Sequence, residues 1–364
     1  MKKMFNNIFE NKKVLITGDT GFKGSWLAIW LKELGADVYG YALPPLRDED
    51  NFVKCNLNEK IHHINGDIRD KEHLVKFFND VKPDIAFHLA AQAIVLESYK
   101  NPHYTFETNV MGTVNFFEAV RNTPSVKAAV NITSDKCYKN NDWVWGYREN
   151  DPVGGKDPYS ASKGCSELIT DSYLNSFFKD TDCKISSARA GNVIGAGDWA
   201  ENRIIPDYFR ALLGKNKLIV RNPIATRPWQ HVLEPLSGYL LLASKLSEDA
   251  KYSGGWNFGP KDEMNYSVRE LLKEINKFDR SVEITESNDS IKPYEAKILK
   301  LDISKAVFKL GWKPVLDFNK TVELTVSGYL NDIKNISDPL ENRIATIKEY
   351  LDIAAKQKIK WSEK

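Results

Sequence analysis

The sequence predicts an α/β protein, with a doubly wound parallel sheet followed by a smaller, mixed α/β lobe. Over residues 1–190, short apolar runs alternate with helical patterns, which is typical of buried parallel strands joined by crossover helices. Residues 232–250 form a further helical pattern that we expect to pack on this first lobe. The rest of residues 191–364 loses the alternation, and its short helices and loops rich in Asn, Gly and Pro predict the second lobe and C-terminal helices.

Composition narrows the class of protein. A chain of 364 residues exceeds one average core, which agrees with two lobes. Because 51 basic residues balance 49 acidic ones, we expect neither a nucleic acid nor a membrane as a partner. No apolar run is long enough to cross a bilayer, and residues 1–13 lack the apolar segment of a secretory signal. The absence of CxxC and HExxH motifs predicts a reduced, cytoplasmic protein without a metal, its cysteines being Cys55, Cys137, Cys165 and Cys183.

The first strand and helix carry a glycine pattern. Lys13–Thr17 is a β-branched apolar run, and Gly18-x-x-Gly21-x-x-Gly24 follows it and opens an amphipathic helix that ends near residue 35. Glycines at such a turn let the backbone approach a pyrophosphate, and a helix N-terminus favours the anion. A tight βα turn without a ligand is the alternative, but the strand before and the helix after favour a dinucleotide site.

The next elements leave the form of the nicotinamide cofactor open between NAD and NADP. A second strand over residues 36–41 ends at Ala42, where an acidic residue usually binds the adenosine ribose. Arg47 is a candidate for a 2′-phosphate, with a solvated loop arginine as the alternative. Further strands are predicted over residues 61–65 and 84–92, and a long helix over residues 101–123.

A fifth strand and the helix after it hold the residues with the clearest chemistry. Ala128–Ile132 is an apolar run that leads into Thr-Ser134-Asp-Lys, and Tyr159 and Lys163 stand four residues apart at the start of a helix that runs to about residue 178. Side chains at i and i+4 share a helix face, so the ammonium can lower the pKa of the phenol and make it a base near neutral pH. A Tyr and a Lys on an ordinary surface helix are the alternative.

Together, the glycine pattern, Ser134 and the Tyr159–Lys163 pair resemble the extended short-chain dehydrogenase/reductase family, whose members oxidise or rearrange sugar nucleotides with a bound nicotinamide. The resemblance implies a Rossmann-like fold and a homodimer or homotetramer formed through the helices at 101–123 and after Tyr159. It also implies a set of cofactor contacts, although Asp67 has helix N-capping as an equally strong alternative. These contacts are Gly18, Gly21, Phe22, Gly24, Asp67, Ile68, Leu89, Ala90, Gln92, Asn109, Tyr159 and Lys163.

The residues after Ser134 separate the reactions of this family. Epimerases of the family carry a pattern like Ser-x-x-x-Tyr at this position, without an acid after the serine. Dehydratases need two further acid–base groups, and this chain has Asp135 and Lys136 there. With the motifs at 157–165, 189–195, 227–235 and 299–305, the chain resembles the CDP-glucose 4,6-dehydratases, which implies deoxysugar and polysaccharide biosynthesis. A 4,6-dehydratase of another nucleotide sugar, a 4-epimerase and a catalytically silent NAD-binding regulator are the alternatives.

The resemblance implies a role for each catalytic candidate. Tyr159 removes the C4 hydroxyl proton, Ser134 hydrogen-bonds that oxygen, and Asp135 donates a proton to the departing C6 hydroxyl. Lys136 either removes the C5 proton or only stabilises the enolate, because neighbouring opposite charges push the pKa values of Asp135 and Lys136 away from these uses.

A nucleoside diphosphate requires cationic and amide donors. The predicted substrate residues are Asn192, Arg203, Arg227 and Gln230, with surface charge as the alternative for the arginines. Residues 93–99 lack the arginine that the family commonly carries after Gln92, which leaves the sugar and the nucleotide open.

Overall fold

The computed structural model of the protein describes residues 1, 4–261, 265–286 and 299–362. A seven-stranded sheet lies at its centre in the order β11-β6-β5-β4-β1-β2-β3, and every neighbouring pair is parallel. This is the doubly wound order of a Rossmann-like sheet, as predicted, with one strand added at an edge. The strands are β1 (Lys13–Thr17), β2 (Asp37–Ala42), β3 (His62–Asn65), β4 (Ile85–His88), β5 (Ala128–Ile132), β6 (Lys184–Arg189) and β11 (Gly254–Asn257).

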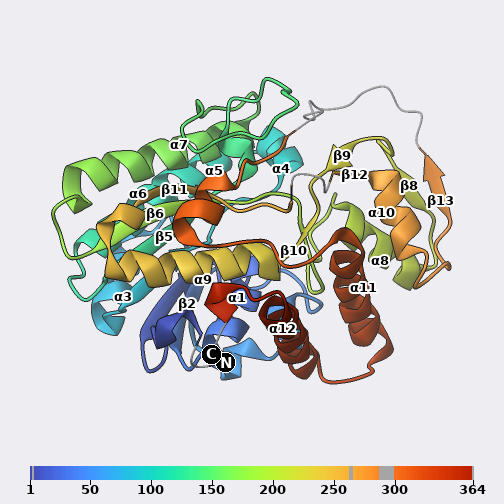
Figure 1. Cartoon of the computed structure of the whole chain (residues 1–364), viewed down its shortest axis with the longest axis horizontal. Helices are drawn as coiled ribbons and strands as arrows, with labels where there is room; N and C mark the ends of the chain where they lie inside the picture. Colours follow the sequence, from blue (N-terminus) through green and yellow to red (C-terminus); the bar gives the residue numbers. More distant parts are fainter. Residues whose placement is uncertain (2–3, 262–264, 287–298, 363–364) are drawn as a thin grey trace.

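Helices cover both faces of this sheet (Figure 1). On one face lie α3 (Lys71–Val81), α6 (Gly112–Arg121) and α7 (Pro158–Tyr173). On the other lie α1 (Phe22–Glu33), α9 (Leu233–Glu248) and α12 (Pro339–Lys356), so the pattern at 232–250 does return to the first lobe. Shorter helical pieces are η1 (Phe5–Asn7), α2 (Asn51–Lys54), η2 (Leu57–Glu59), α4 (Val95–Lys100), η4 (Asp135–Cys137), η5 (Leu174–Phe178), η6 (Ala250–Tyr252), η7 (Ala306–Leu310) and η8 (Lys360–Ser362).

Two expectations about the first lobe are wrong. The helix after the glycine pattern is not amphipathic, because every side chain from residue 24 to residue 31 is buried between the sheet and α12. Trp256, which we expected in the second lobe, belongs to β11 and pairs with Ala188 of the sheet. The boundary at residue 190 therefore stays a prediction, and the first lobe also takes in β11 and α12 from later in the chain.

The helix predicted over residues 101–123 is interrupted by a π-helical turn. It consists of α5 (Pro102–Phe106), η3 (Glu107–Met111) and α6. A π turn holds more than 3.6 residues, so it rotates the apolar positions before it relative to those after it. As a result Phe117 is fully buried whereas Phe106 is 38% exposed. Polar side chains face α7 instead, and Thr113 and Ser166 share a buried hydrogen bond of 2.8 Å between their Oγ atoms.

The helix α12 is attached to the rest of the chain through a buried arginine. The guanidinium of Arg343 has no exposed surface, donates from Nε to Oδ1 of Asn51 at 2.9 Å, and forms an ion pair with Asp332. It also lies 5.5 Å from the ring centroid of Trp26 on α1. A buried cation is stable only when its donors are satisfied, so these contacts fix α12 against α1 and α11 (Phe318–Lys334).

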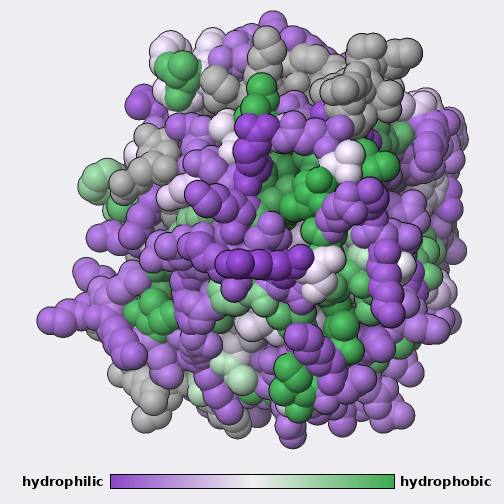
Figure 2. All heavy atoms as spheres, turned by 90° about the vertical axis from the view of Figure 1, so that its right-hand side faces the viewer, coloured by the Kyte–Doolittle hydropathy of each residue, from purple (hydrophilic) through white to green (hydrophobic). Residues whose placement is uncertain are grey.

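The second lobe has a core of its own, in which Phe209 and Tyr329 stack at 4.0 Å between ring centroids. Figure 2 looks onto this lobe and shows a mostly hydrophilic face with hydrophobic atoms gathered near its middle. Within the part of the chain that the structure describes, no helix is both long enough and apolar enough to span a bilayer. Its elements are β7 (Val193–Ile194), α8 (Ile204–Gly214), β8 (Leu218–Val220), β9 (Thr226–Arg227), β10 (Gln230–His231), β12 (Tyr266–Ser267), α10 (Val268–Ile275), β13 (Ile284–Glu286) and α11.

Candidate active site

The turn between β1 and α1 requires glycine at two positions. Gly18 has φ +80°, and a Cβ placed on it would lie 2.6 Å from the backbone nitrogen of Ala90. A Cβ on Gly24 would lie 2.1 Å from the carbonyl oxygen of Gly18. The turn thus packs tightly on the loop after β4, and α1 starts at Phe22 behind Gly21, which has no side chain to cap the first N–H groups. These residues fit a dinucleotide, because uncapped N–H groups at a helix N-terminus bind a pyrophosphate.

Asp67 and Ile68 follow β3 at the same edge of the sheet. The carboxylate of Asp67 accepts hydrogen bonds from Arg69, at 2.9 Å from the backbone nitrogen and 3.0 Å from Nε, and these bonds lower its pKa. The alternative role of Asp67 as an N-cap is wrong, since Asp70 caps α3 by accepting from the backbone nitrogen of His73 at 3.0 Å. The role of Asp67 as a cofactor contact stays a prediction.

The loop after β4 is held by buried polar contacts. The Oδ1 atom of Asn109 accepts from the Gln92 nitrogen at 2.8 Å, and its Nδ2 donates to Ser162 Oγ on α7 at 2.9 Å. Asn109 thus joins this loop, which includes Leu89 and Ala90, to the helix of the Tyr–Lys pair. His88 has a structural role: its Nδ1 lies 2.7 Å from Thr17 Oγ1, and burial lowers its pKa to about 3.

The predicted catalytic residues converge at the carboxyl end of β5. Tyr159, Lys163 and Ser134 are buried, and the side chain of Ser134 hydrogen-bonds that of Tyr159. Ser134 Oγ also donates to Oδ1 of Asp135 at 2.9 Å. Lys136 is half-buried, and among the described residues its ammonium has no hydrogen bond or ion pair. The phenol, the hydroxyl and the carboxylate therefore form one continuous group.

Burial sets the protonation of the Tyr–Lys pair. Burial raises the pKa of Tyr159 to about 12, against the lowering effect of the hydrogen bond with Ser134. Burial likewise lowers the pKa of Lys163 to about 8. The expectation that Lys163 brings the phenol near neutrality is thus wrong for these side chains alone, because loss of water around the phenolate outweighs the nearby charge.

The backbone that follows β6 packs against the carboxylate of Asp135. A Cβ on Gly191 would lie 2.0 Å from Oδ2 of Asp135, so only glycine leaves room for this carboxylate. Asn192, which has φ +53°, donates from Nδ2 to the same Oδ2 at 3.3 Å. Asn192, predicted to bind substrate, thus contacts a catalytic candidate directly.

Lys23 is a site residue that the sequence analysis missed. Burial lowers its pKa to about 8, and the charges of Arg203, Lys163, Asp135 and Asp198 all act on it. In the sequence, Lys23 was detectable only as a cation between the glycines of the pattern, at a position where the pattern requires no particular residue. Arg203 reaches the same region from the second lobe and lies 2.8 Å from Asp198, between Nη1 and Oδ2.

The other two predicted substrate residues differ in exposure. Arg227 is half-buried and donates from Nη1 to the carbonyl oxygen of Thr226 at 2.7 Å. Gln230 is 1% exposed, and its Nε2 donates to the carbonyl of Gly191 at 2.9 Å and, at 3.3 Å, to that of Phe258. The Oε1 atom of Gln230 is buried and has no hydrogen-bond partner among the described residues.

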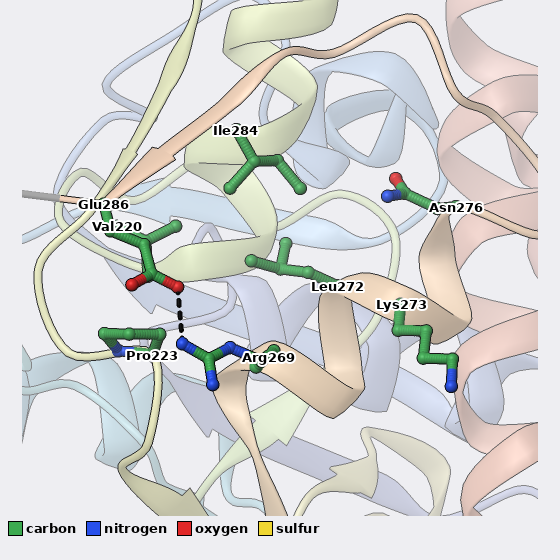
Figure 3. A pocket seen from close by; sticks show the side chains of 8 residues that line it. All are labelled: Val220, Pro223, Arg269, Leu272, Lys273, Asn276, Ile284 and Glu286. Carbon is green, nitrogen blue, oxygen red and sulfur yellow. Dashed lines mark hydrogen bonds and ion pairs between the residues drawn. The ribbon is translucent and has the colours of Figure 1, made fainter.

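A surface cavity of about 230 Å³ lies away from these residues, in the second lobe (Figure 3). An ion pair of 2.7 Å between Arg269 and Glu286 crosses one side of it. It contains none of the predicted site residues, and its lining is Val220, Pro223, Arg269, Leu272, Lys273, Asn276, Ile284 and Glu286.

Comparisons with known proteins identify the family of this chain. A family profile described as GDP-mannose 4,6 dehydratase matches residues 15–325. The CDP-glucose 4,6-dehydratase of Salmonella typhimurium is 49% identical over 325 residues, covering 87% of this chain and 90% of the relative.

Solved structures share the fold at lower identity. The epimerase Mth375 of Methanothermobacter thermautotrophicus has a TM-score of 0.76 at 24% identity, over 90% of this chain and 94% of its own. The dTDP-glucose 4,6-dehydratase DesIV of Streptomyces venezuelae, solved with NAD bound, has a TM-score of 0.73 at 23% identity, over 90% of this chain and 99% of its own. The chain belongs to the GDP-mannose 4,6-dehydratase family, within the extended short-chain dehydrogenases/reductases.

Proposed function

We propose that this protein is an NAD-dependent CDP-glucose 4,6-dehydratase, which removes water from CDP-glucose to form the 4-keto-6-deoxy sugar. One observation supports dehydration over epimerisation: the buried carboxylate of Asp135 shares Ser134 with the base Tyr159. An epimerase needs only to remove and return hydride at C4, whereas a dehydratase must also protonate a leaving hydroxyl. The 49% identity to the Salmonella enzyme supports CDP-glucose as the substrate.

Each site residue is assigned a role in one step of the reaction. Tyr159, as its phenolate, accepts the C4 hydroxyl proton while Ser134 hydrogen-bonds that oxygen, and the Lys163 ammonium stabilises the phenolate. The resulting 4-ketone acidifies the C5 proton, Asp135 in its protonated form gives its proton to the C6 hydroxyl as it leaves, and C5 regains a proton when hydride reaches C6. Lys136, half-buried and without a partner among the described residues, removes the C5 proton or stabilises the enolate. Bound NAD supplies the hydride acceptor for C4 and the hydride donor for C6.

We assign cofactor binding to the sheet side of the catalytic residues and substrate binding to the second-lobe side. Gly18, Gly21 and the start of α1 hold the pyrophosphate of NAD, with Asp67, Ile68 and Gln92 further along the same edge. On the second lobe, Arg203 and Arg227 bind the substrate diphosphate, because guanidinium groups bond phosphate oxygens in pairs.

We also assign an oligomeric state and a cellular location to the enzyme. Exposed apolar side chains on the α5–α6 and α7 helices support a homodimer or homotetramer through this face, among them Phe106 (38%), Met111 (50%) and Leu168 (60%). All four cysteines are free thiols, which supports the reducing cytoplasm, where the product would enter deoxysugar and polysaccharide biosynthesis.

The test is a product assay on a panel of CDP-, dTDP-, GDP- and UDP-sugars. We expect CDP-glucose to lose one water and to give a ketone that absorbs in alkali. A product of unchanged mass would overturn dehydration in favour of the rival 4-epimerase, and turnover confined to another nucleotide would overturn the CDP assignment. For the C5 base, undiminished deuterium exchange at C5 in Lys136→Met would remove Lys136 from that role.

A further inference from the structure

A buried ion pair lies directly behind the catalytic loop. Arg189, the last residue of β6, lies 2.6 Å from Glu167 between Nη2 and Oε2, and their side chains are 6% and 4% exposed. Glu167 stands on α7 four residues after Lys163, and therefore one turn further along the same helix face. Removing two charges from water is costly, so a buried pair is weak support for a purely stabilising role.

Two further hydrogen bonds of this pair reach the two ends of the catalytic loop. Glu167 accepts a short hydrogen bond from Thr133 Oγ1, and another from Ser187 Oγ at 2.6 Å. Arg189 donates from Nη1 to Tyr138 Oη at 2.6 Å and lies 4.9 Å from the centroid of that ring. Thr133 immediately precedes Ser134, and Tyr138 immediately follows Cys137. One ion pair thus anchors the loop that carries Ser134, Asp135 and Lys136 at its start and at its end.

The pair also acts on the charge of Lys163. Burial lowers the pKa of Lys163, and the carboxylate of Glu167 is the largest effect opposing that shift. Lys163 donates to the carbonyl of Ile132 at 3.5 Å, at the beginning of the same loop. The carboxylate of Glu167 therefore both hydrogen-bonds the catalytic loop and favours the charged form of Lys163.

We propose that Glu167 and Arg189 are positioning residues of the reaction, which hold the catalytic loop against α7 and keep an anion one helical turn from the Lys163 ammonium. This proposal rests on the proposed function for its kinetic consequences. Its structural part, the anchoring of the loop, can be measured without any substrate.

The first variant is Glu167→Gln, which keeps the shape and an acceptor oxygen but removes the charge. We expect kcat to fall roughly 10–100-fold with KM within about threefold, because the interaction removed acts on the reacting groups and not on binding. The alkaline limb of the kcat profile should move to lower pH, since Lys163 loses its neighbouring anion. A limb that stays in place would overturn the electrostatic part of the proposal.

The second variant, Thr133→Val, removes the anchor at the loop start and leaves the charge of Glu167 intact. We expect a lower kcat with both pH limbs unmoved. Hydrogen exchange of the peptide covering residues 133–138 should become faster in both variants. Unchanged exchange in both would overturn the anchoring, even if Glu167→Gln folds poorly.

Glu274→Gln is the matched control, because it breaks an ion pair of 2.6 Å with the exposed Lys277 on the second lobe. We expect it to match the unmodified protein in every assay. If the unmodified protein fails to dehydrate CDP-glucose, the proposed function fails, while the exchange measurement still decides the anchoring.

Discussion

The two sides of the site are built in different ways. On the sheet side, Ser134, Asp135, Tyr159 and Lys163 are buried, and they stand at a strand end or on a sixteen-residue helix. On the second-lobe side, Arg227 is half-buried and stands on a two-residue strand. The chemical groups are thus part of the main core, whereas Arg227, assigned to substrate recognition, lies on a short element and is only half-buried. This difference teaches that the reaction and the choice of substrate can change independently.

The variant with the largest expected effect is Tyr159→Phe, which removes one hydroxyl group on the sheet side of the site and tests whether that side carries the chemistry. We expect kcat to fall about 10²–10⁴-fold, the usual contribution of a positioned acid–base group, while substrate affinity changes little. Single-turnover measurement of NADH formation reports the step. Tyr173→Phe on the same helix is the control, because that hydroxyl bonds the surface residue Glu118 at 2.9 Å. Comparable loss in both variants would contradict a catalytic role for Tyr159.

A second change on the sheet side concerns the glycine turn. Gly24→Ala puts a Cβ 2.1 Å from the Gly18 carbonyl, and we expect roughly hundredfold weaker NAD binding, since overpacking costs about 1–3 kcal/mol. Calorimetry with NAD alone measures it. Gly259→Ala is the control, as its nearest neighbour would be 3.5 Å away. Equal NAD affinity in Gly24→Ala would mean that the turn does not hold the cofactor.

A change on the second lobe should affect binding instead. Arg227→Ala should raise KM for the nucleotide sugar roughly 10–100-fold with kcat nearly constant, because a hydrogen bond to a charged group contributes about 1.5–3 kcal/mol. Steady-state kinetics separate the two constants. Arg269→Ala, at the rim of the cavity in Figure 3, is a control in the same lobe. A fall in kcat with unchanged KM would show that the two sides are not separable.

The smallest expected effect concerns the carboxyl group of Glu234. It is buried at the start of α9, and it accepts from the backbone nitrogens of Val315 and Leu316, at 2.9 Å and 2.6 Å, and from Tyr350 Oη at 2.9 Å. Burial raises its pKa to about 7, from 4.5. The folded protein therefore binds a proton that the unfolded chain has released.

Stability should consequently fall as pH rises from about 4.5 to about 7. Linkage gives a loss of about 2 kcal/mol between pH 5 and pH 7 from this group. Denaturant unfolding at both pH values measures it, and Glu234→Gln should remove this part of the pH dependence. An unchanged slope in the variant would assign the effect to other groups.

The sequence predicted the sheet side of the molecule well, because its signals are local. The bounds of β1 and β5 agree with the structure, and the glycine pattern and the Tyr159–Lys163 spacing each depend on neighbouring residues in the chain. The errors come from contacts between distant segments. The outer face of α1 is buried only because α12 lies on it, and Trp256 joins the sheet only because β11 pairs with β6.

The site shows the same division. The residues from Ser134 to Lys163 come together as expected, but the role of Lys23 depends on charges more than a hundred residues away in the chain. The pKa of Tyr159 could not be predicted either, because it depends on how completely the fold excludes water, which no spacing records. Whether Arg203, Arg227 and Gln230 bind substrate stays a prediction.

The attachment of α12 through Arg343 has a consequence for how a cell makes this protein. During synthesis the ribosome releases the glycine turn and α1 early, yet the helix that covers the outer side of α1 emerges more than three hundred residues later. The part of the molecule assigned to the cofactor therefore reaches its final packing only after α12 has left the ribosome, and until then the outer side of Trp26 and its neighbours lacks its cover.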